Sequence, residues 1–223
     1  MTEAAAFAGK TFVLRIDRTP LDERGTLAED LSFLLERKIK PIVVAPSAEI
    51  ARGYVRALNR RSNLAVGLSG ADAALLPAAG RVQTGILATL TAAGYIPVIE
   101  PTALGIGGDD VELAADEVAA AIAGATEAAR ALFFHESGGV LDPLTLDLIA
   151  ELTPAEALAL AERDDLDARL RAAMRAAAHG VRAGVSAAQI LDGRIAHATI
   201  IEFITTHHLG TQVTGSVFTG TTL

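Results

Sequence analysis

The chain has 223 residues, of which 51% are apolar and 4% aromatic, and it carries a formal charge of −8 with a pI near 5.1. This length allows one large domain or two small ones with a sizeable core. The acidic balance excludes a general nucleic-acid or anionic-membrane surface, which would need a basic face, and the absence of cysteine excludes disulfides and thiolate metal sites.

The sequence predicts neither a membrane span nor an export signal. No apolar run reaches about 18 residues without a charge or a breaker, so we expect no membrane span. Residues 1–10 contain Glu3 and lack a basic segment, which predicts a short loose tail, not a signal peptide, and a cytoplasmic protein. Lysine occurs only at Lys10, Lys38 and Lys40, so no later residue can act as a catalytic lysine.

Strand-like and helix-like segments alternate along the chain. Near-continuous apolar runs indicate buried strands, and longer segments with helical spacing indicate helices. In chain order the sequence predicts strand 11–16, helix 27–37, strand 40–46, helix 49–61, strand 64–69, helix 85–94, strand 95–101, helix 110–125, strand 131–136, a β-excursion at 139–152 turning at Asp142-Pro143, helices 153–162 and 167–180, strand 185–191, helix 196–206 and strand 210–213. Thr153, Pro154 and Glu156 give the helix at 153–162 a capping-box start.

This alternation predicts the fold class. Buried strands separated by helices favour a mainly parallel sheet that is covered on both faces. We therefore expect an α/β protein, a three-layer α/β/α sandwich with a mainly parallel central sheet. No linker interrupts the sequence, so residues 11–223 are expected to form a single domain with a reduced N-lobe at 11–110 and a C-lobe at 111–223.

Four segments carry a resemblance to a known family. They are "NLAVGLSGADAALLPA" (63–78), "AAGYIPVIEPTALG" (92–105), "AADEVAAAIAGATEAARALFFHESGGVLD" (114–142) and "GVSAAQILDGRIAHATIIEFITTHHLGTQV" (184–213). In this order they resemble the acetylglutamate kinases of the amino acid kinase family. The last segment is the most specific, because "LDGR", "HA", an apolar helix and "LGT" follow one another as in the family's C-terminal signature.

The resemblance implies a three-layer α/β/α fold and usually a homodimer or larger assembly. The family reaction transfers the γ-phosphoryl group of ATP to the side-chain carboxylate of N-acetylglutamate. Such a transfer depends on positioning, and on positive charge or N–H donors around the moving group.

The first strand departs from the family pattern. In the family it ends in a lysine that is followed, after one residue, by two glycines. Here Arg15 takes the lysine position, and Asp17 and Arg18 take the glycine positions. Asp17 would place a negative charge beside a polyanion, and the planar fork of Arg15 does not freely replace an ammonium group.

Three more departures follow. A second glycine cluster of the family is replaced by "APSAE" (45–49), which contains no glycine. The family's glycine-glycine-methionine loop and its lysine align with "ARLRAA" (168–173), which places Ala173 at the lysine position and leaves Arg171 as the nearest cation. Finally, a single helix joins Pro46 to Arg61, where the family has about 30–40 residues that include a lid over the amino-acid substrate.

Asp116 matches the family aspartate that orients the catalytic lysines, but its companion asparagine positions hold Glu112 and Ala114. Together these departures predict a kinase-deficient relative that binds a small metabolite or assembles with another subunit, with no certain cofactor. The alternative is an active phosphotransferase that uses Mg-ATP and a carboxylate substrate. In that case Arg15 and Arg171 would hold phosphates, and Asp116 or Glu136 would bear Mg²⁺.

Several other motifs allow two interpretations. The turn "HESGG" lies where the family borders its nucleotide, so His135, Glu136, Gly138 and Gly139 are the candidate cofactor-binding residues; a polar turn at a strand end is the simpler interpretation. "GIGGDD" (105–110) could hold an anion, but Asp109 and Asp110 favour a loop that caps the next helix. The pair His207-His208 could bind a metal, although adjacent histidines are weak evidence and we assign no metal site.

The expected partner is another copy of the chain or a related subunit, and neither nucleic acid nor a membrane. The helix at 49–61 corresponds roughly to the family's dimer-forming region. We therefore expect Tyr54, Val55 and Leu58 in the interface. The basic end of this helix, "RALNRR" (56–61), could meet an acidic partner or be a solvated helix end.

Overall fold

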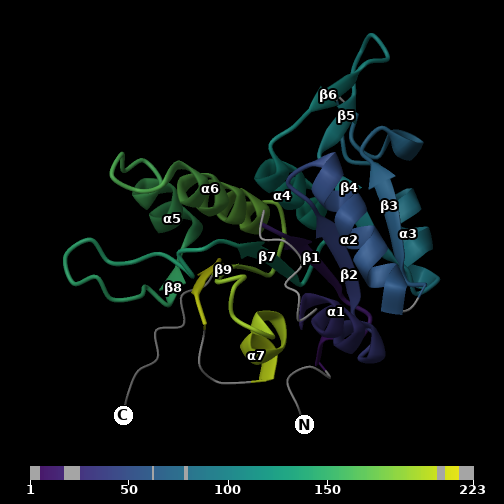
Figure 1. Ribbon diagram of the computed structural model, residues 1–223. Coiled ribbons are helices and arrows are strands. Elements are labelled where there is room, and N and C mark those ends of the chain that lie inside the picture. Colours follow the sequence, from purple (N-terminus) through teal and green to yellow (C-terminus); the bar gives the residue numbers. More distant parts are fainter. Residues whose placement is uncertain (1–5, 18–25, 62, 78–79, 205–208, 216–223) are drawn as a thin grey trace.

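A computed structural model describes residues 6–17, 26–61, 63–77, 80–204 and 209–215 (Figure 1). The strands are β1 (Thr11–Arg15), β2 (Lys40–Val44), β3 (Ala65–Ser69), β4 (Ile96–Glu100), β5 (Thr102–Leu104), β6 (Asp110–Glu112), β7 (Arg130–Phe134), β8 (Glu151–Leu152), β9 (Ala187–Leu191) and β10 (Thr211–Thr214). The helices are α1 (Thr26–Glu36), α2 (Ala48–Arg61), α3 (Gly85–Ala92), α4 (Ala115–Ala125), α5 (Pro154–Leu160), α6 (Ala168–Arg182) and α7 (Ala198–Ile204), with a 3₁₀ turn at Asp72–Ala74.

One eight-stranded sheet forms the centre, in the order β3-β4-β2-β1-β7-β9-β10-β8. β1 pairs in parallel with both β2 and β7, and β9 pairs in parallel with β7. β10 is antiparallel to β9 and parallel to β8. The predicted mainly parallel sheet is confirmed, and its parallel strands bring their carboxyl ends to one edge.

Helices cover both faces of the sheet. The core on one face includes side chains from α3, α4, α5 and α6, and the core on the other face includes side chains from α1 and α2 and Ala198 at the start of α7. In Figure 1 α4 and α6 lie above the central strands, and α1 and α7 lie below them. The three-layer α/β/α sandwich is therefore confirmed.

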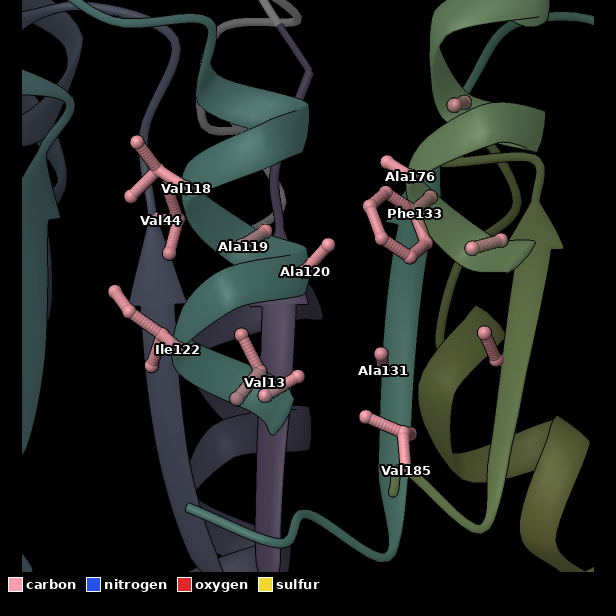
Figure 2. Close-up of a cluster of buried hydrophobic side chains, with 14 of the residues drawn as sticks. Val13, Val44, Val118, Ala119, Ala120, Ile122, Ala131, Phe133, Ala176 and Val185 are labelled. Atoms are coloured by element: carbon pink, nitrogen blue, oxygen red, sulfur yellow. The ribbon is translucent and has the colours of Figure 1, made fainter. Parts of the chain in front are cut away.

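Alanine allows α4 and α6 to pack tightly on the sheet. In Figure 2 Ile122 and Val118 of α4 lie beside Val13 of β1 and Val44 of β2, and Phe133 of β7 lies beside Ala176 of α6. All of these side chains are almost fully buried. A Cβ atom at Gly124 would lie 2.8 Å from the Cβ of Ala183, so this contact leaves no room for a larger side chain at Gly124.

Most predicted elements are found within a few residues of their expected bounds. Thr153 accepts a hydrogen bond from the Glu156 backbone N–H, and the Glu156 side chain accepts one from the Thr153 backbone, so the capping box of α5 is confirmed. The excursion after β7 contains a bridge between Leu141 and Leu148 around a turn at Asp142. A single helix, α2, follows β2, as expected.

The prediction of a helix from residue 110 is wrong. Residues Asp110–Glu112 form strand β6, which pairs with β5 in a hairpin, and α4 begins at Ala115 with Ala114 as its N-cap residue. Asp109 and Asp110 therefore do not cap the helix. "GIGGDD" forms the hairpin turn, in which the Gly105 N–H donates to the Asp109 carbonyl at 2.7 Å.

The segment before β1 is not loose throughout. The ring of Phe7 packs edge-on against Phe12 at 5.2 Å, and the guanidinium of Arg130 lies 4.7 Å from the Phe7 ring centre. The Gly9 N–H donates to the Lys38 carbonyl. Among the described helices, none combines the length and the apolarity that crossing a bilayer requires.

Candidate functional site

The end of β1 and the start of α4 meet through an ion pair. Nη2 of Arg15 lies 3.0 Å from Oδ2 of Asp116, and the two side chains are 12% and 13% exposed. Nη1 of Arg15 lies 3.6 Å from Oδ1 of Asp17 and donates to the Ile16 carbonyl. Burial is the largest influence on the pKa of Asp116 and raises it, against the attraction of Arg15. The guanidinium is therefore already balanced by two carboxylates.

His135, at the end of β7, is held from both sides. Its Nδ1 lies 2.9 Å from the Ser137 hydroxyl, and its Nε2 lies 3.3 Å from Oδ1 of Asp167. Asp167 is the N-cap of α6 and accepts from the backbone N–H groups of Leu170 and Arg169, which lower its pKa. His135 is therefore fixed between the β7 turn and the start of α6.

A second set of ion pairs lies beside His135. Glu136 pairs with Arg169 of α6, and Nη2 of Arg194 donates to the Glu136 backbone carbonyl at 2.5 Å. Arg194 also pairs with Asp192 at 2.8 Å, and this contact lowers the pKa of Asp192. The pKa of Arg169 is raised, first by Glu136 and next by Asp17. Arg169 therefore lies within electrostatic reach of Asp17, the residue that faces Arg15.

Gly138 and Gly139 form the turn that leads away from β7. Their φ angles are +70° and +144°, and a Cβ atom on Gly139 would lie 2.6 Å from Leu148 Cδ1 and 2.9 Å from the Thr211 hydroxyl. The Gly138 N–H donates to the His135 carbonyl, and the Gly139 N–H points to the Ser137 hydroxyl at 3.5 Å. Backbone conformation and close packing account for both glycines, and both N–H groups have partners within the chain.

The structure thus brings Arg15, Asp116, His135 and Glu136 to the carboxyl edge of the sheet, but its described contacts do not bring Arg171 to them. Arg171 pairs instead with Asp164 in the loop before α6, at 3.2 Å. Ala173, at the position expected to hold the family lysine, is 3% exposed and packs in the core beneath α6.

Sequence reasoning assigned no role to four charged residues of this edge, Asp167, Arg169, Asp192 and Arg194, although the quoted motifs "ARLRAA" and "LDGR" contain three of them. Asp167 carried a usable signal, because an aspartate directly before a helical segment is a typical N-cap. The pairing of Arg169 with Glu136 spans 33 residues and has no local signal.

Two of the three residues expected in a dimer interface are buried within the chain itself, and the interface stays a prediction. Tyr54 and Leu58 are buried in the core between α2 and the sheet, so contacts within the same chain already use them. Val55 is partly buried and packs over β3, where a Cβ atom at Gly67 would lie 3.3 Å from it. Any interface on this helix would have to use its exposed face. His207-His208 lies outside the described residues, as does the side chain of Arg61.

Within the described ranges, no group of three or more histidine or acidic side chains is placed to hold a metal ion. Asp116 and Glu136, the two carboxylates considered for Mg²⁺, are each engaged by an arginine. Their geometry fits an ion-pair network better than a cation site, which needs oxygen ligands that face a common point.

Comparisons with known proteins agree with this architecture. Residues 56–186 match the model of the amino acid kinase family. Acetylglutamate kinase of Campylobacter curvus is 33% identical over 220 residues, covering 93% of this chain and 77% of that protein. Acetylglutamate kinase of Zymomonas mobilis is 32% identical over 192 residues, covering 75% of this chain and 64% of that protein.

A third relative, from Novosphingobium aromaticivorans, is 35% identical over 133 residues and is covered over 44% of its length. The chain thus spans less than two thirds of several acetylglutamate kinases that it matches. Among solved structures, N-acetylglutamate synthase from Neisseria gonorrhoeae in complex with coenzyme A and N-acetyl-glutamate superposes with a TM-score of 0.81 at 20% identity, covering 97% of this chain and 62% of that one. This likeness concerns the fold.

Proposed function

Since this chain belongs to the amino acid kinase family and resembles acetylglutamate kinase, we propose that it is a kinase-deficient member that serves as a metabolite-binding or assembly subunit. The single observation that carries the proposal is the state of Arg15. The resemblance implies a lysine at this position, yet the guanidinium of Arg15 is bound by Asp116 at 3.0 Å and faces Asp17 at 3.6 Å.

Phosphoryl transfer needs positive charge that is free to follow the moving group. A guanidinium balanced by two carboxylates offers little net attraction to a triphosphate, and Asp17 would repel it. Binding a phosphate there would require an existing ion pair to open. The pair is mostly shielded from solvent, so its opening would leave Asp116 as a poorly hydrated charge.

Other positions support the same proposal. The end of β2 continues into Ala45, Pro46 and Ser47, so no glycine follows that strand. Ala173, where the resemblance implies a second lysine, is buried and offers no charge. The N–H groups of Gly138 and Gly139 have partners within the chain and do not point to a common vacant position as a phosphate cradle would require.

One observation favours the alternative, an ATP-dependent carboxylate phosphotransferase acting on N-acetylglutamate or a related acyl amino acid. The guanidinium groups of Arg15, Arg169 and Arg194 gather at one edge, and Nε of Arg15 is buried without a hydrogen-bond partner. This function would require the carboxylates to release these arginines. Because Asp116 and Glu136 do not fit a Mg²⁺ site as placed, we derive no step through the metal.

Calorimetry with Mg-ATP, joined to an assay of ADP release in the presence of N-acetyl-L-glutamate, tests the proposal. We expect no binding heat at millimolar nucleotide and no ADP from folded protein. Arg15→Ala and Arg175→Ala form a matched pair, because Arg175 lies on α6 and pairs with Glu162, away from the Arg15 cluster. Nucleotide binding that is lost in Arg15→Ala and kept in Arg175→Ala would overturn the proposal.

The assembly component has a separate test. We propose a homodimer or larger assembly, and light scattering across a dilution series should show a mass above 23.0 kDa at micromolar concentration. A mass that remains that of one chain throughout would reject self-association. It would leave metabolite binding as the remaining form of the proposal.

A further inference from the structure

A pocket of about 50 Å³ lies at the carboxyl edge of the sheet, lined from the face opposite α4 and α6. Its walls come from the ends of β1 and β7, the first turns of α1 and α7, Tyr54 of α2 and the loop after β9. We call it the α1–α7 pocket. The Arg15–Asp116 pair lies on the α4 side of this edge and does not line the pocket.

Thr199 contributes a hydroxyl group without a hydrogen-bond partner to the lining of this pocket. Its side chain is 0% exposed and it lines the pocket, and its hydroxyl oxygen is buried without a hydrogen-bond partner. Buried hydroxyl groups normally have a hydrogen-bond partner, because burial removes their hydrogen bonds to water and leaving them unreplaced costs free energy. A polar group bound in the pocket would satisfy it.

The charges around the pocket are mainly negative. Asp30 of α1 is buried, and its Oδ1 lies 2.7 Å from Nδ1 of His197. The backbone N–H groups of Thr199 and Ile200 also donate to Asp30. Nε2 of His197 faces Glu29 at 3.6 Å, and Asp17 lines the pocket as well. The imidazole of His197 thus faces two carboxylates, and the third, Asp17, lies 3.6 Å from Nη1 of Arg15. Among the described residues here, three carboxylates stand against His197 and Arg15, which favours a bound cation over an anion.

The remaining walls are apolar. Ile16, Leu27, Phe134 and Ile195 line the pocket together with the ring of Tyr54. Apolar side chains of this kind bury a hydrocarbon group favourably, and the face of an aromatic ring also attracts an ammonium group. The pocket has apolar side chains, an unpaired hydroxyl and nearby negative charge. These features suit a ligand with one short apolar part and one positively charged end.

We propose that the α1–α7 pocket binds a small amphiphilic amine, a primary ammonium group carried on a short hydrocarbon. The ammonium donates to the Thr199 hydroxyl oxygen and lies in the field of Asp17 and Asp30, while the hydrocarbon packs against Ile16 and Leu27. Amines that also carry a carboxylate are disfavoured, because the same acidic residues repel it. This inference does not depend on whether the chain transfers phosphate.

Three probes with the same four-carbon chain separate charge from apolar contact: n-butylammonium, 1-butanol and butanoate. Each is titrated into isotope-labelled protein while the methyl signals of Ile16, Leu27 and Ile195 are followed by NMR. We expect saturable shifts at these methyls with n-butylammonium, weaker binding of 1-butanol and no binding of butanoate. Absence of shifts with n-butylammonium at millimolar concentration, or equal binding of butanoate, would overturn the proposal.

Thr199→Val keeps the shape of the side chain and removes only the hydroxyl. We expect it to weaken n-butylammonium binding about tenfold. Thr89→Val, on the exposed surface of α3, is the matched control and should leave binding unchanged. If Thr199→Val binds n-butylammonium as tightly as the unmodified chain, the proposal is wrong.

Asp17→Asn supplies a second readout should Thr199→Val fold poorly. It removes a charge at the pocket wall and keeps the size of the side chain. The preference for n-butylammonium over 1-butanol should fall in this variant, while 1-butanol binding remains. An unchanged preference would show that the field of the pocket does not select cations, which again contradicts the proposal.

Discussion

Nη2 of Arg15 lies 3.0 Å from Oδ2 of Asp116, and this contact joins two residues that are 101 positions apart in the sequence. It connects the end of the central strand β1 to the first turn of α4, and Figure 2 shows that helix packed over β1 and β2. The pair therefore has a structural role that is independent of any ligand.

Arg15→Ala should lower the free energy of unfolding by about 3 kcal/mol, because it leaves a mostly buried Asp116 without its cation. Urea unfolding gives the value directly. Arg163→Ala is the control, since Arg163 pairs with the exposed Asp165 and its loss should cost less than about 1 kcal/mol. Equal losses in the two variants would mean that Asp116 does not depend on Arg15.

The pH dependence of stability should have opposite signs for two carboxyl groups. Burial raises the pKa of Asp116 above 3.8, so the folded state holds that proton more tightly and Asp116 contributes less stability as the pH rises from 3.8 through its raised value. Asp116→Asn has no carboxyl group to titrate and so lacks this decrease in stability with rising pH. Relative to the unmodified chain, the variant should therefore become more stable as the pH rises through that window.

Asp142 should behave in the reverse way. Hydrogen bonds from the backbone N–H groups of Leu144 and Thr145 lower its pKa, so it stabilises the fold above pH 3.8 and that stability is lost as the pH falls through the lowered value. Asp142→Asn should consequently lose stability relative to the unmodified chain as the pH rises. Unfolding curves measured from about pH 2 to pH 7 cover the window below 3.8 for Asp142 and the window above 3.8 for Asp116. Slopes of the same sign for the two variants would contradict the assignment.

Gly139→Ala should destabilise the fold by about 2 kcal/mol, because the added methyl group meets Leu148 and Thr211 and the backbone lies at φ +144°. Gly53 lies within α2 with open space around its Cβ direction. Gly53→Ala should therefore stabilise the chain by about 0.5–1 kcal/mol. Thermal unfolding of both variants measures this contrast, and a neutral Gly139→Ala would show that the turn after β7 can relax.

A lysine at position 173, where the resemblance implies one, should damage the fold. Ala173→Lys places an ammonium group at a position that is 3% exposed, and the expected loss is about 3 kcal/mol or more. Ala172→Lys, one residue earlier on the less buried face of α6, should change stability by less than about 0.5 kcal/mol. If Ala173→Lys were well tolerated and gained Mg-ATP binding, the proposed loss of phosphoryl transfer would need a different cause.

The sequence predicted the layers of the fold because buried strands and amphipathic helices carry local signals. The apolar run at 40–44 and the Thr153–Glu156 capping box each specify their own structure. The β5–β6 hairpin was missed because Asp109 and Asp110 before an alanine-rich segment look the same as a helix cap. Only the packing of Gly105 against Asp109 distinguishes the two, and that contact depends on the folded turn.

The site was predicted less completely than the fold. Arg15, Asp116, His135 and Glu136 were singled out from the resemblance, and the structure places them at the carboxyl edge of the sheet, while their roles stay predictions. The contacts of this edge join residues that are far apart in the sequence. His135 and Asp167 are separated by 32 residues, and Asp30 and His197, beside the pocket, are separated by 167. Charge pairing over such distances leaves no periodic pattern, and only the three-dimensional arrangement reveals it.

Asp17 takes part in both faces of the sheet edge, since its carboxylate faces Arg15 at 3.6 Å and also lines the α1–α7 pocket. An occupant that draws this carboxylate toward the pocket loosens its hold on Arg15. By thermodynamic linkage, any group that binds Arg15 must favour the same occupant to an equal degree. If both faces bind a ligand and Asp17 moves between them, the affinity measured on one face will depend on the occupancy of the other.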